Sequence, residues 1–230
     1  MIWAVVPAAG VGARMNADRP KQYLPLATST VIQQSIERLL SLDVIEKVVV
    51  ATALDDPWWP ALAWSAPERI QQVEGGRERS DSVLSALEWL SQRAEDDDWV
   101  LVHDAARPCL THQDLSQLVR TLVEHPVGGI LATPVTDTIK RAGVEQEIIE
   151  TVERTVLWRA LTPQLFRLGM LRDALQQCRK DGSVVTDDAQ AIERAGFRPQ
   201  LVEGSATNLK VTQAGDLILA EEILQRSRAQ

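Results

Sequence analysis

Two cations, Arg14 and Lys21, follow a loop of small residues, PAAGVG at positions 7–12. The loop comes directly after an apolar run, residues 2–6, which predicts a buried strand. A strand that ends in a Gly/Ala loop leaves backbone N–H groups available to an anion. Cations close to such a loop neutralise more of the anion's charge. The N-terminal segment therefore predicts a polyphosphate site.

Gly10 and Gly12 alone are a weak signal for that site. They match the first two glycines of the dinucleotide-binding fingerprint, but Met15 stands at the third position. The Gly-Lys-Ser/Thr ending of a P-loop is also missing from the segment. An ordinary strand-to-helix turn uses glycines in the same way, where a positive φ is needed. The two cations favour the functional interpretation, because a plain turn has no use for them.

A second glycine pair, Gly75 and Gly76, lies between an expected strand and an expected helix. Paired glycines let the backbone approach a flat ligand closely, so that its N–H and C=O groups can read a base edge. Ser82 adds a hydroxyl in the first helical turn. The segment GGRERSDS is therefore a candidate base pocket, and an ordinary loop before a capped helix is the structural alternative.

Charged residues also follow the expected strand that ends at VHDAARP, residues 102–108. An acid beside a polyphosphate is repelled unless a cation joins the two, so Asp104 predicts Mg²⁺. Arg107 could bind a second phosphorylated substrate, although a local ion pair between Asp104 and Arg107 explains the same two residues. We interpret His103 as a structural histidine. Lys210, just before the last expected helix, would by itself be taken for a surface lysine.

The composition limits the class of protein. The chain has 230 residues, enough for one α/β domain, with a formal net charge of −8 and 45% hydrophobic residues. A nucleic-acid partner would require a basic face, so we expect none. Because no apolar run could span a bilayer and the N-terminus lacks a basic region, we expect no membrane partner, no secretory signal and a cytoplasmic location. Cys109 and Cys178 fit neither a metal site nor a disulfide framework and are expected to be buried.

Strand and helix patterns alternate along the chain. β-branched runs predict strands, and apolar residues three and four apart predict helices. The alternation predicts an α/β fold, a mostly parallel sheet flanked by helices, with ligands at the carboxyl ends of the strands. The expected strands are residues 2–6, 47–52, 70–73, 98–102, 128–134 and 200–202. The expected helices are 31–42, one that Ser80 caps, one that Thr111 caps, 165–178, 187–195 and 214–225.

Residues 135–160 interrupt this alternation. Two short, partly alternating stretches, 136–141 and 148–155, lie on either side of Gly143 and predict a β-hairpin. Such a β-arm has few residues that could form a core alone, so we expect it to pack on a second copy in a homodimer. A flap on its own subunit is the alternative. We expect residues 1–230 to form a single domain that includes this arm.

Together these segments resemble one family, the 2-C-methyl-D-erythritol 4-phosphate cytidylyltransferases of the non-mevalonate isoprenoid pathway. The motifs that carry the resemblance occur in order: PAAGxGxRM followed by KQY, then GGxxRxxSV, VHDAARP, TDTIKR, LTPQ, TDDA and NLKVT. The resemblance extends from Val5 to about Glu222. It implies a Rossmann-like nucleotidyltransferase fold and a homodimer with an exchanged β-arm.

The resemblance also implies a role for each candidate residue. Those implied to contact CTP are Pro7, Ala8, Ala9, Gly10, Gly12, Gly75, Gly76 and Ser82. Arg14 and Lys21 are implied to be catalytic on the α-phosphate, and Asp104 to bind Mg²⁺. Those implied to hold the methylerythritol phosphate are Arg107, Thr162, Thr186 and Lys210, with Thr138 and Arg154 reaching it from the arm across the dimer. The chain departs from the family at Arg77, where an acidic or small residue is common.

The residue inventory fits the chemistry that this resemblance implies. The attacking group is a phosphate monoester, already anionic at neutral pH, so it needs no protein nucleophile and no strong base. Positioning and charge neutralisation are required instead, while an oxygen attacks the α-phosphorus and pyrophosphate leaves. Arg14, Lys21, Mg²⁺ and the loop N–H groups could supply both.

Two alternatives to this function remain open. The first is a cytidylyltransferase for another polyol phosphate, such as ribitol 5-phosphate, which would share the CTP loop. The second is a non-catalytic regulator that binds nucleotides on the same fold. Such a regulator would be expected to have lost Arg14, Lys21 or Asp104, and all three are present.

Overall fold

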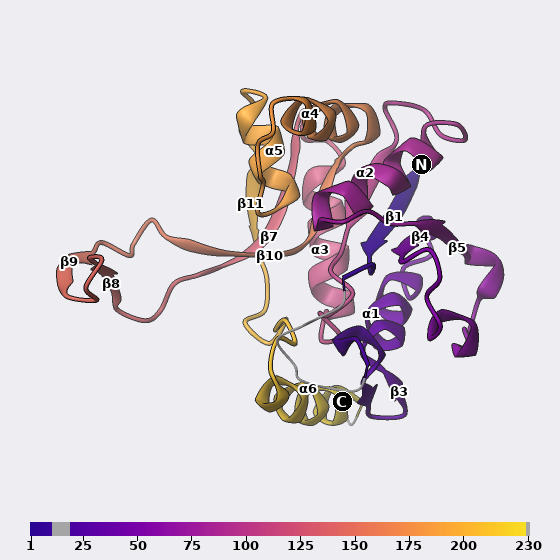
Figure 1. Ribbon diagram of the computed structural model, residues 1–230, viewed down its shortest axis with the longest axis horizontal. Helices are drawn as coiled ribbons and strands as arrows, with labels where there is room; N and C mark the ends of the chain where they lie inside the picture. Colours follow the sequence, from indigo (N-terminus) through magenta and orange to yellow (C-terminus); the bar gives the residue numbers. More distant parts are fainter. Residues whose placement is uncertain (11–18, 229–230) are drawn as a thin grey trace.

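A seven-stranded sheet forms the centre of the computed structural model, which describes residues 1–10 and 19–228 (Figure 1). The strand order is β11-β7-β10-β6-β1-β4-β5. Strand β10 runs antiparallel to β6 and β7, and the other described pairings in this sheet are parallel. The predicted α/β fold with a mostly parallel sheet is therefore confirmed. The strands are β1 (Ile2–Pro7), β4 (Ile45–Thr52), β5 (Ile70–Glu74), β6 (Trp99–Val102), β7 (Gly128–Pro134), β10 (Trp158–Arg167) and β11 (Gln200–Glu203).

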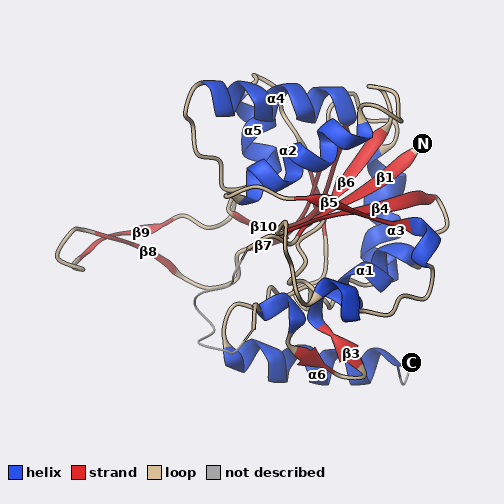
Figure 2. Ribbon diagram, turned by 45° about the vertical axis from the view of Figure 1, so that its right-hand side comes forward, coloured by secondary structure: helices blue, strands red, loops and turns tan. Residues whose placement is uncertain are grey.

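Helices cover both faces of this sheet (Figure 2). One apolar core lies against α1 and α3, and a second lies against α2, α4 and α5. Strands covered on both sides are apolar along their length rather than alternating. This explains why the β-branched run Val48–Val50 in β4 is fully buried. The helices are α1 (Val31–Leu40), α2 (Arg79–Leu90), α3 (His112–Leu122), α4 (Leu168–Lys180) and α5 (Asp188–Arg194).

The last helix, α6 (Ala214–Arg228), packs apart from these two layers (Figure 1). It lies on the short hairpin β2 (Pro25–Leu26) and β3 (Ser29–Thr30) and closes a third, smaller apolar cluster. Cys109 belongs to this cluster and Cys178 to the core under α4, so both cysteines are free and buried, as predicted. The packing of α6 places the last helix beside β2.

Polar side chains define where most of the helices begin. Thr111 caps α3 by accepting from the N–H of Asp114, as predicted. Asp187 caps α5 by accepting from the N–H of Gln190. The prediction that Ser80 caps α2 is wrong. Glu78 is the N-cap, and its N–H donates to the carboxylate of Asp81. This arrangement puts Ser80 inside the first turn, where it has no capping role.

The predicted helix 165–178 is also partly wrong, because residues 165–167 form the end of β10. Leu165 pairs with Leu101 of β6 on one side and with Gly129 of β7 on the other. Two strand partners satisfy the backbone there, so the strand continues to Arg167, and α4 begins at Leu168. Leucine spacing across the strand–helix junction resembles helical periodicity, which explains the error.

The predicted β-hairpin is confirmed in residues 135–160 and projects far from the sheet (Figure 1). Its strands are β8 (Ile139–Ala142) and β9 (Ile148–Val152). The side chains of Ile148 and Ile149 are 66% and 61% exposed. Exposed apolar residues in this number on a thin arm are typical of a surface that another chain covers.

Among the described residues, no helix combines the length and the apolar character that crossing a bilayer requires.

Candidate active site

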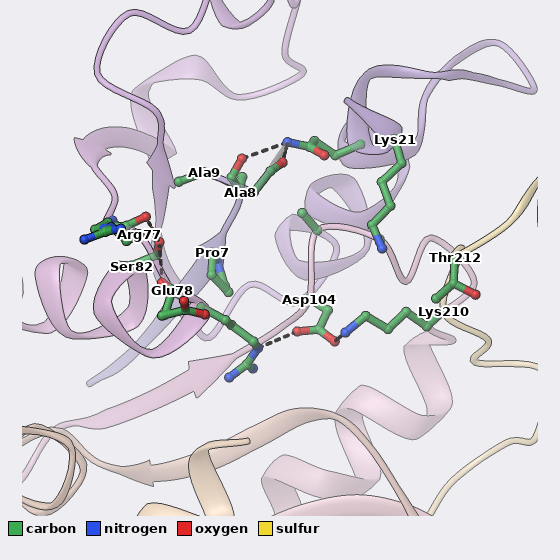
Figure 3. A pocket seen from close by; sticks show the side chains of 16 residues that line it. Pro7, Ala8, Ala9, Lys21, Arg77, Glu78, Ser82, Asp104, Lys210 and Thr212 are labelled. Atoms are coloured by element: carbon green, nitrogen blue, oxygen red, sulfur yellow. Dashed lines mark hydrogen bonds and ion pairs between the residues drawn. The ribbon is translucent and has the colours of Figure 1, made fainter. Parts of the chain in front are cut away.

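A cavity of about 350 Å³ lies where β1 and β6 end, at the carboxyl edge of the sheet (Figure 3). Open α/β sheets bind their ligands at this edge. Five separate segments supply its walls. The predicted site residues among its lining are Pro7, Ala8, Ala9, Gly10, Lys21, Gly76, Ser82, Asp104 and Lys210. Gly12 and Arg14 lie outside the described residues.

The first loop is held by a glutamine that the predicted site did not include. The side-chain amide of Gln22 donates to the carbonyls of Ala8, at 2.8 Å, and of Gly10, at 3.0 Å. Gln22 is only 4% exposed, so water cannot easily replace these bonds. Because Gln22 directly follows Lys21, it joins the loop and the lysine into one unit.

The Lys21 side chain extends into the cavity (Figure 3). Its Nζ donates to the carbonyl oxygen of Val211 at 3.0 Å, which ties the start of the chain to the segment before α6. The short 3₁₀ turn Lys21–Tyr23 is anchored on its other side by Tyr23, whose hydroxyl donates to Asp56 at 2.7 Å. The lysine ammonium is therefore positioned by contacts at both ends of its turn.

The glycine pair lies against the first loop, and its close packing requires glycine. A Cβ on Gly75 would come within 2.6 Å of the Cβ of Ala9. The N–H of Gly76 donates to the Ser82 hydroxyl at 3.1 Å, and that hydroxyl also lies 3.2 Å from the carbonyl oxygen of Glu78. Ser82 lines the cavity and at the same time shapes the loop before α2.

Asp104 is the electrostatic centre of the cavity. Its Oδ1 lies 2.9 Å from Nε of Arg79, and its Oδ2 lies 2.8 Å from Nζ of Lys210 (Figure 3). Nε of Arg107 is 3.6 Å from Oδ2. Burial alone would raise the pKa of the Asp104 carboxyl, but these cations hold it well below its ordinary value. Asp104 is therefore ionised at neutral pH.

His103 is a structural residue at the end of β6. It is fully buried, with Nε2 3.1 Å from the carbonyl oxygen of Arg107 and Nδ1 3.0 Å from the hydroxyl of Thr162. A carbonyl can only accept, so Nε2 carries the proton and Nδ1 accepts from Thr162. Burial lowers the pKa of His103 to about 4, which keeps the ring neutral. The Thr162 hydroxyl also accepts from the N–H of Asp104 at 3.1 Å.

The remaining predicted substrate ligands lie at different distances from the cavity. Arg107 reaches Asp104 and also donates to the carbonyl of Asn208 at 2.8 Å. Thr186 is exposed and lies at the start of the segment that leads into α5. Thr138 and Arg154 are on the exposed arm and do not line the cavity of their own chain. A role for these two residues requires the arm of another subunit.

Sequence reasoning also missed Arg79 and Asp188. Nη2 of Arg79 lies 2.8 Å from Oδ2 of Asp188, while its Nε holds Asp104. Both residues lie inside motifs, GGRERSDS and TDDA, that were noted for other members. The signal that could have identified them is their opposite charge, because the two segments that carry them both approach the same strand ends.

This fold, with a cation-rich cavity at the carboxyl edge of its sheet, is the nucleotidyltransferase fold of the solved structures that it matches. Solved structures with the same fold include a 2-C-methyl-D-erythritol 4-phosphate cytidylyltransferase from Francisella tularensis, 34% identical, with a TM-score of 0.84 over 96% of this chain and 99% of that one. Another, from Thermus thermophilus, is 28% identical, with a TM-score of 0.77 over 96% and 98% of the two chains.

Sequence comparison gives the particular family. The family model for 2-C-methyl-D-erythritol 4-phosphate cytidylyltransferase matches residues 2–226. A relative of that name from Vibrio vulnificus is 54% identical over 98% of this chain and 95% of its own length. One from Pseudomonas entomophila is 54% identical over 94% and 92%. The chain belongs to the 2-C-methyl-D-erythritol 4-phosphate cytidylyltransferase family and is an enzyme.

The role of Gln22 gives a prediction about nucleotide binding. In Gln22→Glu the amide donors are lost, and a carboxylate faces the carbonyl oxygens of Ala8 and Gly10. We expect the affinity for CTP to fall at least tenfold, on the order of 1.4 kcal/mol, measured by calorimetry. Gln200→Glu makes the same change on an exposed position of β11 and should leave CTP affinity unchanged. Equal affinities in the two variants would contradict the role of Gln22.

Proposed function

We propose that this cavity transfers CMP from CTP to 2-C-methyl-D-erythritol 4-phosphate and that the substrate phosphate attacks the α-phosphorus of CTP directly. The reaction yields 4-diphosphocytidyl-2-C-methyl-D-erythritol and pyrophosphate. The family match supports these substrates. The observation that carries the mechanism is the convergence of Lys21 and Lys210 on one cavity that also contains the first loop.

The mechanism requires charge neutralisation more than proton transfer. An oxygen of the substrate phosphate forms a bond to the α-phosphorus, the bond to the bridging oxygen breaks, and pyrophosphate leaves with that electron pair. Negative charge accumulates around the α-phosphate, so a preorganised cation there lowers the barrier. Lys21 is placed for this role, since its ammonium lies inside the cavity and is fixed by Val211. Arg14 is proposed as its partner.

The two substrates would occupy different walls of the cavity. CTP would lie along residues 7–10, with Gly12 in the continuation of the loop, and its base would be read by Gly75, Gly76 and Ser82. The polyol phosphate would lie near the second wall, where Arg107 and Lys210 meet at Asp104. Thr162 and Thr186 are proposed to complete that wall.

Asp104 is proposed to hold Mg²⁺ together with phosphate oxygens of CTP. No described group of three or more His, Cys, Asp or Glu side chains could hold a metal alone. Mg²⁺ in nucleotide sites uses one or two carboxylates and takes its other ligands from phosphates and water, so a single ionised aspartate in the cavity fits it. When bound, the ion would neutralise phosphate charge.

The enzyme is proposed to act as a homodimer in which each arm completes the partner's cavity. The arm projects away from the central sheet (Figure 1), and Ile148 and Ile149 on it are exposed. Thr138 and Arg154 lie on this arm, where a phosphate in a partner's cavity could meet them.

A substrate panel tests the proposed reaction. Purified enzyme with CTP and Mg²⁺ is offered 2-C-methyl-D-erythritol 4-phosphate or ribitol 5-phosphate, and pyrophosphate release is followed. We expect turnover with the first and at least about a hundredfold lower kcat/KM with the second, because the second-substrate wall was selected for one polyol. Turnover with ribitol 5-phosphate alone, or CTP binding without any turnover, would refute the proposal.

The role of Lys21 gives a sharper prediction. Lys21→Ala removes a preorganised cation from the α-phosphate and should lower kcat at least about a hundredfold. Lys180→Ala removes an exposed lysine at the end of α4, outside the cavity, and should keep wild-type kcat. A near-normal kcat in Lys21→Ala would remove this residue from the catalytic machinery.

Mixed dimers test the exchange of arms. Lys21→Ala and Arg154→Ala are each purified as inactive or weakly active proteins, then refolded together. If arms are exchanged, one cavity of each mixed dimer combines an intact Lys21 with an intact Arg154, so about a quarter of all cavities recover under random pairing. A mixture no more active than its components would show that each arm serves its own subunit.

A further inference from the structure

Arg79 joins two carboxylates that belong to different parts of the fold. It is the first residue of α2, and its guanidinium contacts Asp104 at the end of β6 and Asp188 at the start of α5. Residue 188 is 109 positions away in the chain. A planar guanidinium can bond two carboxylates at once in fixed directions, which an ammonium cannot. The contact therefore links the base-side loop, the strand end and the TDDA segment.

Asp188 is held in place independently of Arg79. Gln164 of β10 donates to Asp187 at 2.9 Å and accepts from the N–H of Ala189 at 2.9 Å, so hydrogen bonds fix the residues on both sides of Asp188. Asp188 itself is fully buried, and its Oδ1 has no hydrogen-bond partner among the described residues. A buried carboxylate with a single ionic partner is costly and specifies its geometry strongly. Asp188 thus provides a rigid anchor for Arg79.

The other two cations that contact Asp104, Lys210 and Arg107, also have a proposed role in substrate binding. Lys210 is 39% exposed at its side chain and, with Arg107, is proposed above to hold the second substrate's phosphate. Once these two cations turn to a phosphate, Arg79 is the contact of the Asp104 carboxylate that remains among the ion pairs of the described residues. The orientation of the Arg79 guanidinium is then set by Asp188 alone.

We propose that Asp188 and Arg79 are positioning residues that hold the Asp104 carboxylate in its reactive place while Arg107 and Lys210 bind the substrate. Neither residue acts on the substrate in this proposal: Asp188 acts through Arg79, and Arg79 acts through Asp104. The inference rests on the proposed function. It adds to that function a fixed support that runs from α5 through α2 to the end of β6.

Two conservative variants test this support. Asp188→Asn keeps the shape and one acceptor oxygen but removes the charge, and Arg79→Lys keeps the charge but loses the widely spaced donors that a guanidinium directs at two carboxylates. For each variant, kcat, the KM of both substrates, the calorimetric CTP affinity and the urea unfolding midpoint are measured. We expect kcat to fall about thirtyfold or more in each, while both KM values and the CTP affinity stay within about threefold.

The double variant, Asp188→Asn with Arg79→Lys, shows whether the two residues act through one another or independently. If Asp188 acts only through Arg79, the double variant should lose no more kcat than the worse single variant. The matched control is another arginine–aspartate pair, Arg172 and Asp96, 2.6 Å apart on the surface. Arg172→Lys and Asp96→Asn should leave every kinetic constant unchanged.

Three results would overturn the inference: folded single variants with wild-type kcat, multiplicative losses in the double variant, or kcat losses that only follow the loss of folded protein. Should Asp188→Asn fail to fold, Arg79→Lys decides the question, because it keeps the positive charge and the Arg79 side chain is 26% exposed. Inactivity of the wild-type enzyme would instead refute the proposed function, and wild-type turnover is measured in the same assay.

Discussion

The buried carboxylate of Asp104 is the interaction on which the rest of the site depends. The side chains of Arg79, Arg107 and Lys210 bring like charges together around Asp104, and they can approach closely because one ionised carboxylate lies between them. Each cation comes from a different segment, so the same contact fixes how α2, the strand end and the segment before α6 lie together. A phosphate that enters the cavity finds these cations already assembled. It replaces the Asp104 carboxylate as their anionic partner, so binding requires little reorganisation.

The fold was predictable where local pattern and burial agree. The parallel strands are covered on both faces, so their sequences are apolar runs that stand out, and the exposed, alternating arm contrasts with them. The errors occurred where a partner distant in sequence decides the conformation. Leu165 is extended because β6 and β7 lie on either side of it, and nothing in its neighbourhood shows those strands. The start of α2 was misplaced by two residues because Glu78 and Asp81 satisfy the backbone that Ser80 was expected to cap.

The site was predictable to a similar depth and for a related reason. Residues that approach a ligand from loops at strand ends carry recognisable types, and the structure gathers Lys21, Asp104 and Lys210 in one cavity. Residues that act by positioning other residues have no such recognisable type. Gln22 is recognised only when its bonds to two loop carbonyls are seen, and Asp188 only when the arginine 109 positions away is found beside it. Long-range hydrogen bonds of this kind depend on the tertiary structure, so a sequence motif identifies the residue but not its role.

The affinity of the cavity for inorganic pyrophosphate, titrated by calorimetry without divalent metal, tests the central role of Asp104 most directly. If Asp104 is the anion that the cations surround, Asp104→Asn frees them for pyrophosphate and should bind it at least about tenfold more tightly than wild type, a gain on the order of 1.4 kcal/mol. The variant must be folded, as its unfolding midpoint will show. An affinity equal to or weaker than that of the wild type would contradict the account, because the cations would then be held in place by something other than this carboxylate.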